Sequence, residues 1–124
     1  MTAIRCAGLL SKFAEHFVVD RAGSGKVVEV YPGAALRYWL VETNGYRNSS
    51  IVREKLISQL QDLAPWLDLG IHRELMVESC DAFDSVFAAL AARAAERGLS
   101  NAPDPKYLPT AEVEGWIHLP KVEL

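Results

Sequence analysis

The sequence is poor in the features that mark secreted, membrane and polyanion-binding proteins. Two cysteines, Cys6 and Cys80, are too few for a disulfide scaffold and lack the short spacing of a zinc site. The formal net charge of −3 gives no general attraction to nucleic acid. Lys12, Glu15 and His16 interrupt the N-terminal apolar pattern, which excludes a signal or membrane helix there. These absences predict a cytoplasmic protein without membrane contact, and both cysteines are expected to be buried thiols.

The remaining composition indicates one folded domain spanning residues 1–124. Half of the residues are hydrophobic and 23% are charged, as in ordinary globular domains of this length. The three histidines, His16, His72 and His118, have no neighbouring ligand-type residues at zinc-site spacing. Gly23-Ser24-Gly25 is too short for a dinucleotide fingerprint, and neither a P-loop nor a nucleophile elbow is present. No common catalytic motif therefore identifies an activity.

The N-terminal third predicts a helix followed by a strand. Apolar residues recur at three- and four-residue intervals from Ala3 to Val18, which is typical of an amphipathic helix. Its buried stripe is expected to consist of Cys6, Leu9, Leu10, Phe13 and Phe17. A glycine-containing loop over 20–25 comes next. Residues 26–31 (Lys-Val-Val-Glu-Val-Tyr) are mostly β-branched and aromatic, and they predict the clearest strand of the chain.

The rest of the chain is predicted to be mainly helical. Pro32 fits the first turn of a helix that continues to Trp39, and Ser49 or Ser50 can cap a helix that ends before Pro65. In that helix Val52, Leu56, Leu60 and Leu63 form the apolar stripe, and Arg53 is expected on the solvated side. Residues 72–78 fit a short helix or an extended segment, 81–97 an alanine-rich helix, 101–105 a loop and 113–119 a second strand. The prediction is a helix-rich α/β domain with one or two strands and four to five helices.

Four stretches in this order resemble a known family. They are residues 27–36 (Val-Val-Glu-Val-Tyr-Pro-Gly-Ala-Ala-Leu), 45–47 (Gly-Tyr-Arg), 81–84 (Asp-Ala-Phe-Asp) running into 91–95, and 114–120 (Glu-Gly-Trp-Ile-His-Leu-Pro). The chain resembles the domain of unknown function family numbered 429, whose members are predicted nucleases with an RNase H-like fold. No antiparallel meander carrying a metal-binding aspartate precedes the first helix. The resemblance therefore implies the C-terminal half of such a domain, a partial RNase H-like fold.

The resemblance also implies site residues. Glu29 would be the strand carboxylate and Asp84 or Asp81 the helix carboxylate of a catalytic centre that binds Mg²⁺ or Mn²⁺, because hard cations take oxygen ligands. Tyr46 and Arg47 would contact the substrate phosphate. Each residue also has an ordinary structural interpretation. Glu29 can face solvent at a strand end, Asp81 can cap a helix, and Tyr46 and Arg47 can pack on the surface.

The expected function is that of a fragment or subunit of a metal-dependent nuclease, inactive alone because the first-strand aspartate is lacking and Mg²⁺ dehydrates reluctantly. Its partners would be a separate N-terminal half, a second copy of the chain as a homodimer, or nucleic acid. An unpaired strand beside an apolar face favours such association. The alternative is a non-catalytic protein-interaction module or homo-oligomeric remnant of the fold. A small-molecule enzyme would instead require a deep pocket.

Overall fold

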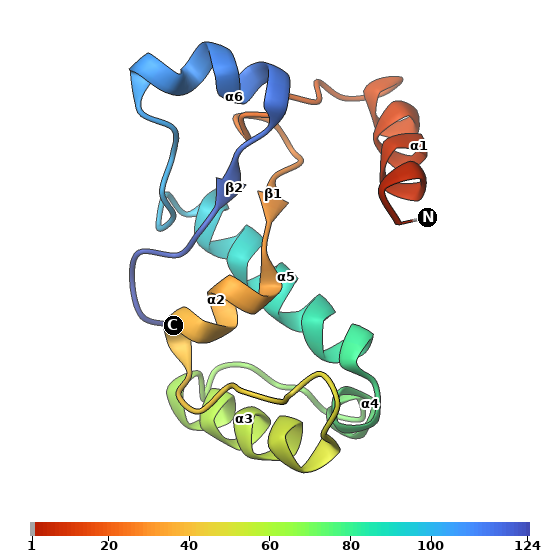
Figure 1. The fold of residues 1–124 in the computed structure, drawn as a ribbon, viewed down its shortest axis with the longest axis vertical. Coiled ribbons are helices and arrows are strands. Elements are labelled where there is room, and N and C mark those ends of the chain that lie inside the picture. The colour runs from red at the N-terminus through yellow and green to blue at the C-terminus, as the bar shows by residue number, and fades with distance from the viewer. Residues whose placement is uncertain (1) are drawn as a thin grey trace.

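The computed structural model describes residues 2–124, in which a short two-stranded sheet lies against one long helix (Figure 1). The elements are α1 (Thr2–Ala14), β1 (Glu29–Val30), α2 (Pro32–Trp39), α3 (Ser50–Leu63), α4 (His72–Glu78), α5 (Cys80–Glu96), the 3-10 helix η1 (Pro105–Tyr107), α6 (Leu108–Glu114) and β2 (Ile117–His118). The two strands are parallel, with Glu29 opposite Ile117 and Val30 opposite His118. The helix-rich α/β class is confirmed, with α6 as a helix that the sequence did not predict.

Helix α5 is the central element of the fold. It crosses the middle of the molecule, with the two strands and α2 beside it and α3 and α4 near its N-terminal end (Figure 1). Its alanines favour a helix, and the Ser79 hydroxyl caps it by accepting a hydrogen bond from the amide of Ala82 at 3.2 Å. Phe83 and Phe87 on its buried face are fully covered, and their ring centroids are 4.9 Å apart. The core therefore forms along one side of this helix.

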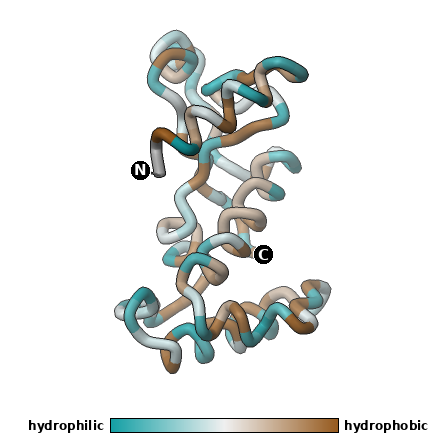
Figure 2. The backbone as a smooth tube through the Cα atoms, turned by 90° about the vertical axis from the view of Figure 1, so that its right-hand side faces the viewer, coloured by the Kyte–Doolittle hydropathy of each residue, from teal (hydrophilic) through white to brown (hydrophobic). Residues whose placement is uncertain are grey.

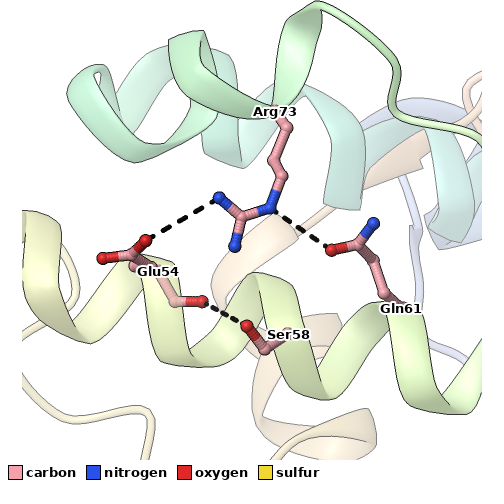
Figure 3. A network of polar contacts seen from close by, with 4 residues as sticks. All are labelled: Glu54, Ser58, Gln61 and Arg73. Atoms are coloured by element: carbon pink, nitrogen blue, oxygen red, sulfur yellow. Dashed lines mark hydrogen bonds and ion pairs between the residues drawn. The ribbon is translucent and has the colours of Figure 1, made fainter.

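Helices α2, α3 and α4 bear out the predicted boundaries. Pro32 starts α2, and the Ser49 hydroxyl caps α3 by accepting from the amide of Val52 at 3.3 Å. Residues 72–78, which the sequence left open, form α4. Arg73 of α4 lies 3.8 Å from the Glu54 carboxylate and donates to Gln61 at 3.4 Å, both on α3 (Figure 3). Such exposed contacts add little stability, so buried Leu56, Leu60 and Met76 are the main contributors to this packing.

The strand predictions were too long. Only Glu29 and Val30 of segment 26–31 pair, and in the tail Val113 belongs to α6 while Ile117 and His118 form β2. Gly115 separates α6 from β2 with a φ of 97°, a conformation that side chains disfavour. His118 is buried, and its ring nitrogens lie 2.9 Å from the Ser100 hydroxyl and 3.0 Å from the Ala22 carbonyl. This histidine thus joins three distant segments and is a structural residue.

Helix α1 differs most from the prediction. It ends at Ala14, and it stands apart from the other helices (Figure 1). Its predicted buried stripe is largely in solvent: Leu9 is 56% exposed, Phe13 is 40% exposed, and Cys6, expected to be a buried thiol, is exposed. Cys80 is half-buried. The expectation of a buried stripe was wrong because, among the described residues, the core forms along α5 and no other element packs closely on α1.

Hydrophobic and hydrophilic residues alternate along the helices (Figure 2). Within residues 2–124, no helix is both long and apolar enough to cross a membrane. The pattern is typical of helices that bury one face and hydrate the other.

Arg53 departs from its predicted place on the solvated side of α3. It is only 5% exposed. Its guanidinium donates to the carbonyls of Tyr46 at 2.6 Å and Arg47 at 3.3 Å, and also to those of Val77 at 2.9 Å and Glu78 at 3.2 Å. A buried cation is tolerated when hydrogen bonds replace its lost hydration. Arg53 thereby fixes the loop before α3 against the end of α4.

Replacing Arg53 by methionine is expected to lower the free energy of unfolding by about 2–4 kcal/mol, because buried carbonyls lose their donors while the aliphatic volume is largely kept. The matched control, Lys55→Ala on the exposed side of the same helix, is expected to change it by about 0.5 kcal/mol or less. Urea unfolding followed by circular dichroism measures both. Equal effects of the two substitutions would contradict the assigned role of Arg53.

Candidate functional site

Three of the five predicted site residues meet in space. Tyr46 and Arg47 come from the loop that Arg53 anchors, and Asp84 projects from the early part of α5. The Tyr46 ring packs on Phe83 of the same helix, with centroids 5.3 Å apart, and is only 6% exposed. The Arg47 side chain is exposed, and its guanidinium lies 5.8 Å from the centroid of the Tyr46 ring. The group forms one cluster, named here the Tyr46–Asp84 cluster.

Two polar atoms in the cluster are buried without partners. Within the described part of the chain, Tyr46 Oη and Asp84 Oδ1 are the buried side-chain oxygens and nitrogens that make no hydrogen bond. Burying an unpaired polar atom costs about 1–3 kcal/mol, and most native proteins avoid it. Asp84 is nevertheless near enough to raise the pKa of Tyr46, so the two atoms are neighbours, and a water, an ion or a ligand group between them would complete their hydrogen bonding.

The Tyr46 hydroxyl lies against the start of α2. A Cβ placed on Gly33 would be 3.3 Å from Tyr46 Oη and 3.7 Å from Arg37 Nη1, so the missing side chain makes room for both. The guanidinium of Arg37 lies 5.7 Å from the centroid of the Tyr31 ring. The first turn of a helix leaves backbone amides without intrahelical partners and carries a partial positive charge. Two arginines and this helix start make the surroundings of Tyr46 locally basic in an acidic chain.

Protonation states in the cluster follow from burial and from the neighbouring charges. Burial raises the pKa of Tyr46 above its ordinary value; Arg47 lowers it and Asp84 adds to the increase. Tyr46 in turn raises the pKa of the Arg47 guanidinium. Burial, with a contribution from Asp84, also raises the pKa of the Cys80 thiol. At neutral pH the cluster therefore presents a phenol, a thiol and a guanidinium around the Asp84 side chain.

Glu29 and Asp81 lie outside the cluster. Glu29 is exposed on β1, and its carboxylate lies against Gly115, next to the guanidinium of Arg21. Asp81 is exposed in the first turn of α5, where Ser79 rather than Asp81 provides the cap. Within residues 2–124 no three His, Cys, Asp or Glu side chains are arranged to hold a metal ion. Glu29, Asp81 and Asp84 therefore do not form a common metal site from this chain alone.

Four residues around the cluster were not identified as site residues from the sequence. Gly33 and Arg37 were included only as part of a helix, Arg53 was placed in solvent, and Cys80 was treated as an ordinary buried thiol. Pro32-Gly33 at a strand-to-helix junction was the available signal, because glycine at the second position of a helix suggests close approach of another group. No sequence signal showed that Arg53 would be buried.

The fold and the cluster define a helix-rich α/β domain with a tyrosine, an arginine and an aspartate gathered beside the start of a helix. The chain belongs to the family described as "Protein of unknown function (DUF429)", whose model matches residues 2–107. The resembling stretch at 114–120 lies beyond the matched residues. No curated protein and no solved structure matches the chain.

Replacing Tyr46 by phenylalanine tests the unpartnered hydroxyl. The ring packing is kept and a buried group without a hydrogen bond is removed, so the free energy of unfolding is expected to be unchanged or to rise by up to about 1 kcal/mol. Tyr38→Phe, at an exposed tyrosine, is the control and should have no effect. A loss of stability in the Tyr46 variant alone, measured by urea unfolding, would show that the hydroxyl has a partner in the folded chain.

The stability of Tyr46→Phe is also expected to depend on pH differently from that of the wild-type protein under alkaline conditions. A raised pKa means that Tyr46 holds its proton more tightly in the folded chain than in the unfolded chain. Protonated Tyr46 therefore contributes to the free energy of unfolding below the ordinary pKa of 10.0, and this contribution is lost as the pH rises above that value. Wild-type protein should therefore lose more stability than Tyr46→Phe between about pH 9 and pH 11. Cys80 contributes equally to both proteins. Parallel stability curves across this range, from thermal melts, would contradict the raised pKa.

Proposed function

We propose that this chain is a subunit or fragment of an RNase H-like, metal-dependent nuclease, and that the Tyr46–Asp84 cluster is its contribution to the active site. Asp84 would hold Mg²⁺ or Mn²⁺, and Tyr46 and Arg47 would bind the phosphate of the scissile bond. The single observation that supports this most is the pair of buried, unpartnered oxygens, Tyr46 Oη and Asp84 Oδ1, beside an exposed guanidinium.

The side chains suit the two parts of such a site. A carboxylate oxygen is a preferred ligand of Mg²⁺ and Mn²⁺, while a guanidinium and a phenol hydroxyl can donate hydrogen bonds to phosphate oxygens. A bound divalent ion would polarise the phosphate and activate a water for hydrolysis of the P–O bond. Arg47 is placed to orient the phosphate from solvent, and the protonated Tyr46 can donate but does not act as a base at neutral pH.

The chain would be inactive alone. Asp84 is the one carboxylate in the cluster, and a single carboxylate holds Mg²⁺ weakly because the ion keeps most of its water. Glu29, the strand carboxylate that the resemblance implies, lies on β1 with its carboxylate against Gly115, and the two-residue strands leave sheet edges that another polypeptide could extend. A separate polypeptide supplying the meander and its aspartate would complete both the sheet and the ligand set.

One observation favours the alternative of a non-catalytic interaction module. Helix α1 exposes apolar residues, and a groove of about 330 Å³ beside it is lined by both apolar and polar residues: Leu9, Lys12, Phe13, Glu15, His16 and Phe17. An isolated helix of 13 residues is only marginally stable in water, so a covering surface would stabilise it. In this alternative, a second copy or another protein covers α1, and the Tyr46–Asp84 cluster has no catalytic role.

Metal binding by the isolated chain is the first test of the proposed function. Titration with Mn²⁺ should broaden NMR signals around Tyr46 and Asp84 at millimolar concentrations, because paramagnetic relaxation reports weak binding. Asp84→Asn should abolish this local broadening, and the matched substitution Asp81→Asn, three residues earlier on the same helix, should leave it intact. If the broadening persists in Asp84→Asn, or if Asp84→Asn and Asp81→Asn reduce it equally, a metal-binding role for the cluster is contradicted.

Complementation tests the nuclease directly. The chain is mixed with a polypeptide carrying a three-stranded meander and an acidic first strand, and cleavage of a labelled single-stranded oligonucleotide is followed with Mg²⁺ or EDTA. Cleavage is expected only in the Mg²⁺-containing mixture, and Asp84→Asn should slow it by at least about a hundredfold. If the mixture forms a complex but does not cleave, the interaction-module alternative is supported and the nuclease proposal fails.

A further inference from the structure

A second cavity lies on the other side of α5 from the Tyr46–Asp84 cluster. Arg93 follows Asp84 by nine residues, which at 3.6 residues per turn places the two side chains on opposite faces of the helix. The cavity has a volume of about 220 Å³ and is bounded by Trp39, Trp66, Leu90 and the C-terminal residues 122–124. Nothing in the proposed nuclease function uses it.

The walls of the cavity are aromatic and aliphatic. Trp39 is fixed because its indole nitrogen donates to the carbonyl of Val122 at 3.0 Å, and Leu124 packs against the hydrophobic core. Trp66 follows Pro65 and is 49% exposed. A cavity of about 150 Å³ accommodates benzene, whereas drug-sized ligands occupy about 300 Å³ or more. The available volume therefore fits one aromatic ring with a short polar substituent.

Two arginines give the cavity its charge. Arg93 lies in the last turn of α5 and Arg97 directly follows the helix as its C-cap, and both line the cavity. The Arg93 guanidinium stacks on Trp66, 4.3 Å from the ring centroid, which orients it and leaves its in-plane N–H groups free to donate. Within residues 2–124, neither guanidinium makes a hydrogen bond or ion pair with another side chain. Both are therefore available to an anion.

Glu123 also lines the cavity and limits the charge of a ligand. Among the side chains that line the cavity, the two guanidiniums outnumber this one carboxylate, so they favour an anion, while Glu123 opposes a second negative charge on it. Paired N–H groups of arginine match the two oxygens of a carboxylate. We propose that this cavity binds a small aromatic carboxylate, with its ring between the tryptophans and aliphatic residues and its carboxylate on Arg93 and Arg97. The site is independent of the Tyr46–Asp84 cluster.

Tryptophan fluorescence reports on this site, because two of the three tryptophans line the cavity. The full chain is titrated with phenylacetate, with its neutral analogue 2-phenylethanol, and with adenosine monophosphate, with calorimetry as a second measurement. Phenylacetate is expected to bind at least about tenfold more tightly than 2-phenylethanol, because the alcohol cannot pair with the arginines. Tighter binding of adenosine monophosphate than of phenylacetate would overturn the assignment of a carboxylate ligand.

Charge variants locate the binding to the cavity. Arg97→Ala should weaken phenylacetate binding by about tenfold, and Glu123→Gln should strengthen it by about two- to threefold because it removes a repulsive charge. Arg5→Ala, at an exposed arginine of α1, is the matched control and should not change it. No saturable binding at millimolar phenylacetate, or equal effects of Arg97→Ala and Arg5→Ala, would overturn the proposal. Metal binding at Asp84 should be the same in all these variants, so either proposal can fail without the other.

Discussion

The buried guanidinium of Arg53 is the contact on which the candidate site depends. It holds the carbonyls of Tyr46 and Arg47 from one side and those at the end of α4 from the other, so the loop has one position relative to α3 and α4. Tyr46 then packs on Phe83, which places its hydroxyl near Asp84 and Gly33. The hydrogen bonds of this guanidinium hold the loop more strongly than the same number of neutral hydrogen bonds would, because charged donors make stronger hydrogen bonds.

The cluster that this loop completes leaves two of its own polar atoms unpaired. Two buried oxygens without hydrogen bonds oppose folding, although the surrounding aromatic packing is close. Proteins commonly keep such costs where a function requires the groups, and stability is then supplied elsewhere. Here the core along α5 and the contacts of Arg53 supply it. The combination of a stable frame and unsatisfied polar atoms is what makes this cluster, rather than Glu29 or Asp81, the strongest candidate for function.

Among the described residues, some apolar surface and both short strands are left without further covering elements. The exposed face of α1 and the two short parallel strands are features that other proteins cover with further elements. They fit a protein that works with another polypeptide, in the proposed nuclease as well as in the interaction-module alternative. By contrast, the cavity at Trp39 and Trp66 is formed within the chain itself. Its volume of about 220 Å³ is the reason that the proposed ligand is small.

The sequence by itself determined α2, α3 and α5, because their signals are local: Pro32 and Ser49 at helix starts, Gly98 after a helix end, and the alanines of α5. It also predicted the family, which the match over residues 2–107 bears out, and it singled out Tyr46, Arg47 and Asp84. Only the tertiary structure decided that Arg53 is buried, that α1 is largely exposed, and that Tyr46 and Arg47 meet Asp84 while the Glu29 carboxylate lies against Gly115. These outcomes depend on contacts between helix faces that are tens of residues apart in the sequence. The periodicity of a segment shows that it has an apolar face, but it does not identify which element covers that face.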